Sequence, residues 1–100
     1  MTEVKKIIKW VIKWESGEMN PDDEAKFFQE LINSGQVWRL QGSYVRRAMQ
    51  LLEEGRVMLG KKGHYDYYGN YVPSRYEVKA GTEGSPQYFK RMKKKLEEVI

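Results

Sequence analysis

The sequence predicts a mainly α fold (α+β class): a compact bundle of about four helices, with a small β-hairpin or an ordered Tyr-rich loop between helices three and four. Four segments support the helices, because each carries apolar residues at helical spacing. Residues 60–76 break that spacing and are rich in Gly and Tyr, which is typical of turns and short strands. A chain of 100 residues is too short for two independent cores, so we expect a single domain, residues 1–100.

The composition excludes several classes of protein. A hydrophobic content of 40%, with 13% aromatic residues, is enough for a packed core and excludes a disordered chain. The sequence has no cysteine, which excludes disulfides, Cys-based zinc sites and thiol nucleophiles. The N-terminus lacks the apolar stretch of a signal peptide and the longest apolar runs are short, so we expect a soluble, cytoplasmic protein. The net charge of +4 does not by itself identify a nucleic-acid binder.

The first two helices follow from periodicity and capping. Residues 3–15 carry a broad apolar arc opposite a lysine face, and we expect Trp10 and Trp14 to pack at the edge of the core. The lysine face is most simply solvated, and the alternative is contact with phosphates or an acidic protein. Asn20 is a good N-cap for the second helix, which runs to about Ser34, with Pro21 at its first position. Three acidic residues in its first turn are explained by the helix dipole without a metal: Asp22, Asp23 and Glu24.

A short internal repeat organises the middle of the chain. The segment LINSGQVW, at 31–38, is answered by LLEEGRVM, at 51–58. In both, an apolar helix ending runs into a Gly, one polar residue and then a Val. Glycine adopts the left-handed conformation that closes a helix, and the Val can fold back over the last turn. The repeat therefore predicts two helix ends, at Gly35 and at Gly55.

Between these ends the sequence predicts a connecting segment and the third helix. Residues 36–41 are too few for a helix, so we expect an extended segment or a single irregular turn that places Trp38 in the core. Ser43 is the expected N-cap of a helix over 44–54. Its predicted inner stripe is Val45, Ala48, Met49 and Leu52, with Leu51 beside it.

The rest of the chain predicts turns, short strands and a last helix. Residues 56–59 favour a strand, 60–63 and Gly69–Asn70 favour turns, and 75–79 are compatible with another short strand. Ser85 is the expected N-cap of the last helix, with Pro86 at its first position. One face of that helix is apolar and its outer surface is basic. The apolar face comprises Phe89, Met92, Leu96, Val99 and Ile100.

Residues suited to catalysis are few. His64 is the only histidine and has Asp66 two residues away, but without a second His or a Cys the pair is weak support for metal binding or acid–base work. A histidine in a loop is far more often exposed and inert. No nucleotide-binding or nucleophile motif is present. We therefore expect a protein that is not an enzyme and that has no catalytic residues, metal or cofactor.

The segment SYVRRAMQLLEEGRVML, at 43–59, resembles the recognition helix and wing of winged-helix domains. It has a capping Ser, a V-R-x-A pattern and an L-x-x-x-G-x-V entry into the wing, over roughly a third of the chain. One departure weakens the resemblance, because about eight residues precede this helix where the motif's turn takes three or four. The resemblance implies nucleic-acid contacts from Ser43, Arg46, Arg47 and Gln50, with Lys61 and Lys62 at the wing tip.

Most of residues 7–59 resembles small, functionally uncharacterised proteins of tailed bacteriophages. The residues that carry this are ELINSGQVWRLQGSYVRRAMQLLEEG, and the later segment YYGNYVPSRYEVKAGTEGSP is similar. The resemblance implies expression in the host bacterial cytoplasm, and it supplies no active site. Small phage proteins commonly act by binding a host machine, including defence systems.

The sequence therefore supports two main hypotheses of function, and a third interpretation is a structural module that mainly oligomerises. The first is a non-enzymatic phage-type accessory protein that binds a host or defence (anti-CRISPR-like) complex and modulates or inhibits it. The alternative is a winged-helix-like nucleic-acid-binding protein. Tyrosine offers rigid, amphipathic contact area at low entropy cost, which suits the first hypothesis. The expected partner-binding residues are Tyr65, Tyr67, Tyr68, Tyr71 and Tyr76.

Overall fold

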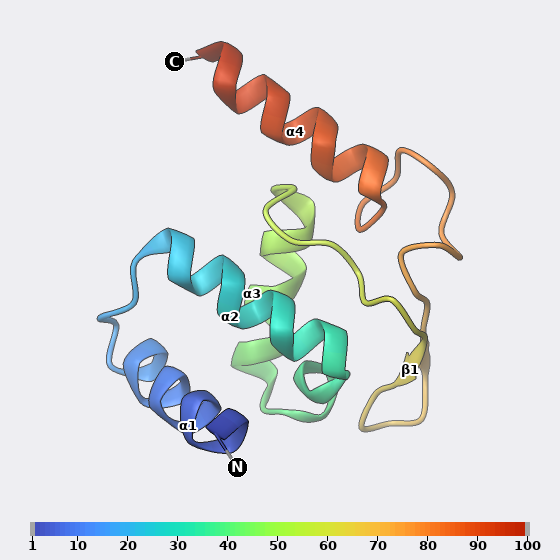
Figure 1. The fold of residues 1–100 in the computed structure, drawn as a ribbon. Helices are drawn as coiled ribbons and strands as arrows, with labels where there is room; N and C mark the ends of the chain where they lie inside the picture. The colour runs from blue at the N-terminus through green and yellow to red at the C-terminus, as the bar shows by residue number, and fades with distance from the viewer. Residues whose placement is uncertain (1, 100) are drawn as a thin grey trace.

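The computed structural model describes the backbone of residues 2–99 and the side chains of residues 7–98. The described residues form four α-helices, one 3-10 turn and a two-stranded antiparallel hairpin between α3 and α4 (Figure 1). This confirms the predicted fold class. In chain order the elements are α1 (Thr2–Glu15), α2 (Pro21–Ser34), η1 (Gln36–Arg39), α3 (Gly42–Glu53), β1 (His64–Tyr65), β2 (Tyr71–Val72) and α4 (Pro86–Val99).

Capping fixes the start of α2 as predicted. The Asn20 side-chain oxygen accepts a hydrogen bond from the Asp23 backbone N–H at 2.9 Å, and Pro21 occupies the first helical position. The two glycines of the internal repeat also end their helices as predicted, with φ of 80° at Gly35 and 73° at Gly55. The valine that follows each glycine is buried, so both helix ends contribute to the core.

The core is an aromatic cluster shared by α1, α2 and α3. The Trp14 ring lies 5.2 Å from Phe28 and 4.6 Å from Tyr44, and the Trp10 ring lies 5.7 Å from Phe27. The Trp14–Phe28 and Trp10–Phe27 rings pack edge-on, and pairs of this kind add to the free energy gained by burial. Both tryptophans therefore pack against the core, as the sequence predicts. The apolar arc of α1 is broader than its buried face, because Ile8 and Ile12 are exposed.

The connecting segment is the predicted single turn. Residues Gln36–Arg39 form η1, which buries Val37 and Trp38, so the extended alternative is wrong. The predicted N-cap at Ser43 is also wrong. The helix begins at Gly42, after Gln41, whose backbone carbonyl accepts hydrogen bonds from the N–H groups of residues 44 and 45. A glycine is costly inside a helix but is tolerated in its first turn, so the helix starts at this residue.

The buried stripe of α3 differs from the predicted one by a rotation of the helix. Tyr44 is buried beside Trp14, whereas Met49 is 50% exposed and Val45 is half-buried. The described stripe comprises Tyr44, Ala48, Leu51 and Leu52. The aromatic cluster decides this rotation, because the Tyr44 ring packs 4.6 Å from the Trp14 ring and a tyrosine ring buries more surface than a methionine side chain.

The segments predicted as further strands are not strands. Residues 56–59 are irregular because other groups satisfy their backbone. The Gln29 amide accepts from the Met58 N–H at 2.7 Å and donates to the Met58 carbonyl at 3.0 Å. The Leu59 N–H donates to the Gly84 carbonyl at 3.0 Å. Residues 75–79 form a turn, and the side chain of Arg75 donates to the Leu59 carbonyl at 2.9 Å.

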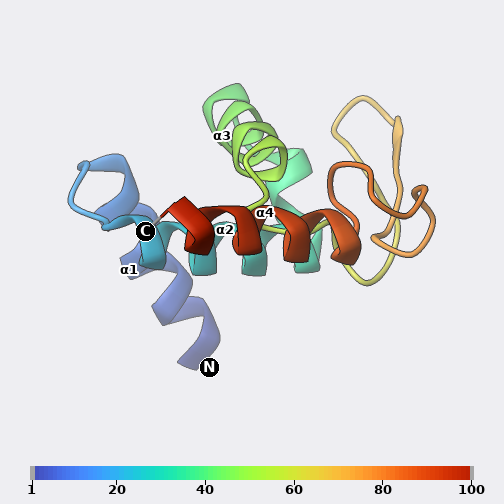
Figure 2. The same ribbon diagram turned by 90° about the horizontal axis from the view of Figure 1, so that it is seen from above.

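Ser85 caps α4 as predicted. Its side-chain oxygen accepts hydrogen bonds from the Tyr88 N–H at 3.1 Å and from the Gly81 N–H at 3.0 Å. Seen from above, α4 passes over α2 (Figure 2). Two residues of its predicted apolar face, Val99 and Ile100, lie outside the described side chains. None of the described helices is long and apolar enough to cross a lipid bilayer.

Ser85→Ala is expected to destabilise the fold by about 1–2 kcal/mol. The substitution removes a buried capping hydroxyl whose oxygen accepts hydrogen bonds from two backbone N–H groups. Urea unfolding followed by circular dichroism measures this loss. Ser43→Ala is the matched control. Since Ser43 is exposed and caps nothing in the described structure, its replacement should change stability by less than about 0.5 kcal/mol. Equal losses in the two variants would contradict the capping assignment.

Candidate partner-binding surface

Five tyrosines of the hairpin region are exposed. Strand β1 pairs antiparallel with β2, and Tyr65 lies opposite Tyr71. All five keep half or more of their surface accessible, so they do not belong to the core of the described chain. We call them the tyrosine surface: Tyr65 (63%), Tyr67 (73%), Tyr68 (85%), Tyr71 (50%) and Tyr76 (68%).

The hairpin turn is fixed by one carboxylate. An Asp66 side-chain oxygen accepts hydrogen bonds from the backbone N–H of Tyr68 at 2.9 Å and of Asn70 at 2.8 Å. The Gly69 N–H donates to the Asp66 carbonyl at 3.0 Å, and Gly69 takes a φ of 82° that the turn requires. The tyrosines at the tip are therefore held on an ordered turn.

The hairpin is also attached to the helical body. The Tyr67 N–H donates to the Trp38 carbonyl of η1 at 3.1 Å. The His64 ring lies over Gly35, and its Nε2 is 3.2 Å from the Asn33 carbonyl. His64 is thus half-buried against the end of α2, in contrast to the exposed, inert loop histidine that the sequence predicts.

Neighbouring groups order the tyrosine rings. Tyr65 and Tyr71 pack edge-on with centroids 5.3 Å apart, and Tyr67 and Tyr68 do so at 5.4 Å. The Tyr71 hydroxyl donates to the Glu77 carboxylate at 2.7 Å, and this hydrogen bond raises the pKa of Tyr71. Rings held in this way lose little conformational entropy when a partner covers them.

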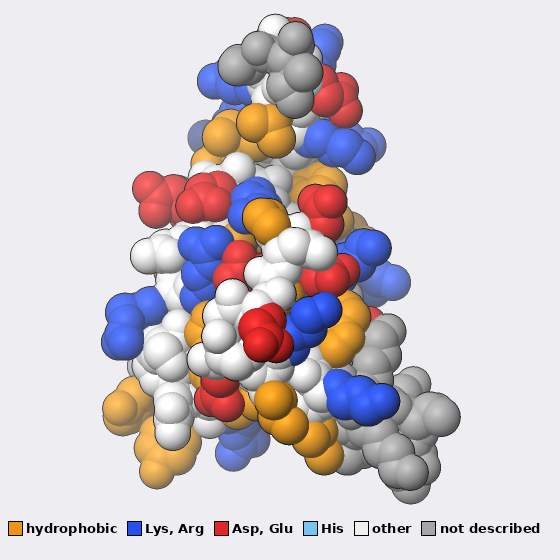
Figure 3. All heavy atoms as spheres, turned by 90° about the vertical axis from the view of Figure 1, so that its left-hand side faces the viewer, with side chains coloured by type: hydrophobic (Ala, Val, Ile, Leu, Met, Phe, Trp, Pro, Cys, Tyr) orange, Lys and Arg blue, Asp and Glu red, His pale blue; other side chains and the backbone are white. Residues whose placement is uncertain are grey.

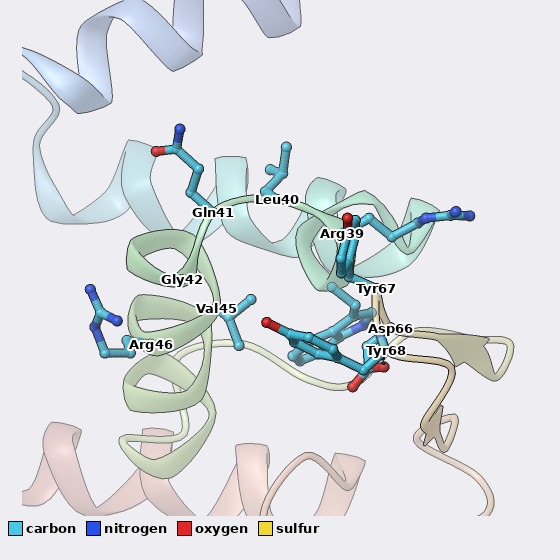
Figure 4. Close-up of a pocket in the computed structure, with 10 residues that line it drawn as sticks. Arg39, Leu40, Gln41, Gly42, Val45, Arg46, Asp66, Tyr67 and Tyr68 are labelled. Carbon is cyan, nitrogen blue, oxygen red and sulfur yellow. Dashed lines mark hydrogen bonds between the residues drawn. The ribbon is translucent and has the colours of Figure 1, made fainter.

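A recess of about 510 Å³ separates the hairpin tip from η1 and the start of α3. The side chains of Val45 and Tyr68 point toward one another across it (Figure 4). Arg39 and Arg46 lie on its two sides and point away from the centre (Figure 4). The recess is thus apolar at its centre, with Arg39 and Arg46 at its margins and the Asp66 carboxylate, which holds the hairpin turn, beside Tyr68.

The residues predicted to contact nucleic acid differ in their surroundings. Arg47 is held by Glu24 through two hydrogen bonds of 2.7 and 2.9 Å, and Trp14 donates to the same carboxylate at 2.8 Å. Gln50 accepts from Arg47 at 3.0 Å. The other four residues of that set are exposed: Ser43, Arg46, Lys61 and Lys62. The two lysines precede β1, so they do not lie at the hairpin tip.

The sequence gives no signal that joins Glu24 to Arg47. Glu24 fits the first turn of α2, where the dipole favours it, and Arg47 opposes the dipole of α3, which suggests binding. Only the packing of α2 against α3 shows that each satisfies the other. The Arg47 hydrogen bond lowers the pKa of Glu24 below its ordinary 4.5, against the opposing effect of burial.

This depressed pKa predicts acid sensitivity. A carboxylate with a lowered folded pKa contributes stability that is present above its unfolded pKa, near 4.5, and is lost as the pH falls through the folded value. Glu24→Gln should therefore flatten the loss of stability below about pH 4.5, as measured by urea midpoints across pH. Asp22→Asn, at an exposed carboxylate, is the control. A wild-type slope in Glu24→Gln would contradict the role of this pair.

Among the described residues, no group of three or more His, Cys, Asp or Glu side chains is placed to hold a metal ion. His64 and Asp66 have separate partners, since the first contacts Asn33 and the second holds the hairpin turn. The arrangement brings exposed rings together with Arg39 and Arg46, for which the described part of the chain offers no partner, and this suits recognition of another molecule.

The chain belongs to a family described as a domain of unknown function, DUF7417, which it matches over residues 1–72. The match runs from α1 through β2 and contains four of the five surface tyrosines. No curated protein and no solved structure matches the chain.

Proposed function

We propose that this chain is a non-enzymatic, phage-type accessory protein that binds a host or defence protein complex through the tyrosine surface and modulates or inhibits it. The observation that carries the proposal is the exposure of four tyrosines on a hairpin that is fixed to the helical body, with a fifth, Tyr76, in the turn that follows it.

Uncovered aromatic surface favours association with protein. Tyrosine is enriched at protein–protein interfaces because its ring buries apolar area while its hydroxyl remains able to hydrogen-bond. Tyr67 and Tyr68 stand on a turn fixed by Asp66, so little entropy is lost when a partner orders them. A rigid aromatic pair of this kind has the properties of a binding hot spot.

The recess beside these rings supports the same proposal. Its centre, between Val45 and Tyr68, accepts an apolar side chain of a partner. Arg39 and Arg46 at its margins have no hydrogen bond or ion pair among the described side chains. They would pair with carboxylates around that side chain, which gives an apolar centre and a polar rim.

Replacing Tyr67, Tyr68 and Tyr71 with Ala is expected to weaken partner binding by at least about 30-fold, the equivalent of one hot spot of about 2 kcal/mol. Helical circular dichroism should remain unchanged, because these rings lie outside the core. Partner capture from a bacterial lysate, followed by titration of the purified partner, measures the loss.

The matched control replaces the same three residues with Phe, which keeps the ring area and removes only the hydroxyls. We expect this variant to retain most of the affinity. Full binding by the Ala variant would refute the assignment of the surface, and loss of helical signal in it would show that the tyrosines support the fold.

Nucleic-acid binding is the alternative, favoured by Arg46, Lys61 and Lys62, which are exposed and unpaired among the described residues. The engagement of Arg47 by Glu24 counts against it, since α3 then offers fewer free cations. This alternative predicts a duplex-DNA mobility shift that falls steeply with salt and is lost in Arg46→Ala/Lys61→Ala/Lys62→Ala. Under the leading proposal, no such salt-dependent shift is expected.

A further inference from the structure

Among the described residues, helix α4 is attached to the body through contacts of its first half. The Tyr88 hydroxyl donates to the Glu53 carbonyl, and the side chain of Met92 packs directly on Gly55. The Arg91 guanidinium donates to the Gly81 carbonyl at 3.1 Å. Beyond Met92 the helix extends away from the other helices (Figure 1), and Leu96 is 65% exposed.

This attachment leaves a cleft between the second half of α4 and the start of α2, with a volume of about 830 Å³. We call it the α4 cleft. Its apolar lining comes from both walls: Ala25 on α2, and Phe89, Met92 and Leu96 on α4. In Figure 3, α4 forms the upper end of the molecule, where Lys and Arg side chains gather, and apolar side chains lie directly below them. The volume lies within the ~300–1,000 Å³ that binding pockets usually have.

The charges that line the α4 cleft are mainly positive. Glu54 is compensated by Arg56 at 4.0 Å, and Arg56 also donates to the Pro21 carbonyl at 2.6 Å. Asp22 is the remaining acidic residue of the lining, and the remaining basic residues are Lys26, Lys93 and Lys95. An occupant of this cleft therefore meets an apolar floor with an excess of ammonium groups at its edges.

We propose that the α4 cleft binds an acidic amphipathic helix of a protein partner. In such a complex the apolar face of the partner helix covers Phe89, Met92 and Leu96, and its carboxylates pair with Lys93 and Lys95. This is helix-in-groove recognition, in which apolar anchors at helical spacing supply affinity and flanking charges supply specificity. The site is separate from the tyrosine surface, and its occupancy does not depend on the proposed function.

Charge and shape disfavour two other occupants. If the apolar faces of two copies of α4 paired, the lysines that flank each face, Lys93 and Lys95, would lie close to those of the other copy. Like charges opposed in this way destabilise the pair. An anionic membrane requires an apolar face open to a plane, whereas these side chains line a cleft that is walled on one side by the start of α2.

The test is a selection from a displayed library of helical peptides against the whole protein. We expect the enriched peptides to carry apolar residues at i, i+3 or i+4 and i+7, with Asp and Glu on their flanks. Their affinities, measured by fluorescence anisotropy, should fall as salt rises. Enrichment of basic or neutral sequences, or no enrichment, would overturn the proposal.

Matched charge reversals locate the site. Lys93→Glu/Lys95→Glu should weaken the selected peptides at least about 10-fold. Lys90→Glu/Lys94→Glu makes the same change of charge on the face of α4 that does not line the cleft, and we expect less than about a threefold effect. Equal effects would overturn the proposal.

Two further measurements exclude the other occupants. Vesicles of phosphatidylglycerol and light scattering over a range of protein concentrations should show neither membrane binding nor a dimer. Membrane binding or a dimer that Lys93→Glu/Lys95→Glu abolishes would also overturn the proposal. The Tyr67, Tyr68 and Tyr71 triple variant should bind the selected peptides as the wild type does, which separates this site from the tyrosine surface.

Discussion

Phe28→Ala is expected to lower the free energy of unfolding by about 3–5 kcal/mol, the largest effect of any single substitution considered for this protein. Phe28 is fully buried and its ring lies 5.2 Å from Trp14, 5.3 Å from Phe27 and 6.2 Å from Tyr44. Its removal opens a cavity where three helices meet, and the rings around that cavity cannot all move to fill it. The total free energy of unfolding of a domain of this size is about 5–15 kcal/mol, so this substitution removes a large part of its stability.

Urea unfolding monitored by far-UV circular dichroism gives this number, and near-UV circular dichroism reports the tryptophans beside the cavity. Met49→Ala is the control, because it also truncates a large apolar side chain within a helix, here α3. Met49 is half exposed in the described structure although the sequence places it on the inner stripe, so its truncation should cost less than about 0.5 kcal/mol. A loss in Phe28→Ala below about 1 kcal/mol would contradict the aromatic core.

Gly35→Ala is expected to cost about 2–5 kcal/mol, for two reasons that add. The φ of 80° at Gly35 is left-handed, which costs a residue with a Cβ about 1–2 kcal/mol. A Cβ there would also lie 2.3 Å from Nδ1 of His64, so the ring and β1 must shift, at about 1–3 kcal/mol. The variant should therefore loosen the hairpin as well as the end of α2.

Gly17→Ala separates the two contributions. Gly17 has nearly the same φ, 77°, but a Cβ there meets no atom within 4 Å. Its replacement should cost only the conformational part, about 1–2 kcal/mol, and leave the hairpin intact. Hydrogen exchange of the backbone N–H groups of Asp66 and Tyr67 reports the hairpin directly. If these N–H groups exchanged as slowly in Gly35→Ala as in the wild type, that result would contradict the packing of His64 on Gly35.

Local patterns in this sequence predict the parts of the fold that local chemistry determines. The helix caps and helix-ending glycines depend on hydrogen bonds and φ angles within a few residues, so their roles follow from sequence spacing alone. These residues are Asn20, Gly35, Gly55 and Ser85. The shortness of the segment between two helices predicts the burial of Trp38, but it allows an extended segment as well as the single turn that forms.

Features that depend on packing between helices could not be predicted in this way. The start of α3 at Gly42 depends on the direction in which the chain leaves η1. The burial of Tyr44 in place of Met49 depends on the ring of Trp14. The strand-forming tendency of residues 56–59 is overridden because Gln29, nearly thirty residues earlier, satisfies the backbone of Met58.

In the candidate surface, too, local sequence predicts some features and packing between distant segments determines the others. Its tyrosines could be named from the sequence, but their exposure depends on how the hairpin is fixed to η1. The pairing of Arg47 with Glu24 engages one residue of the nucleic-acid set, and no spacing in the chain indicates this pairing. The recess between Val45 and Tyr68 joins residues more than twenty positions apart and exists only in the folded chain.

Photo-crosslinking from position 68 tests the central claim most directly, because Tyr68 is the most exposed of the five tyrosines. A benzophenone side chain placed there should form a protein adduct in bacterial lysate that survives nuclease treatment. The same group at the exposed Glu18, in the turn between α1 and α2 on the far side of the molecule from the hairpin (Figure 1), should form none. An adduct at position 68 that nuclease removes, or equal protein adducts from both positions, would contradict a protein-binding tyrosine surface.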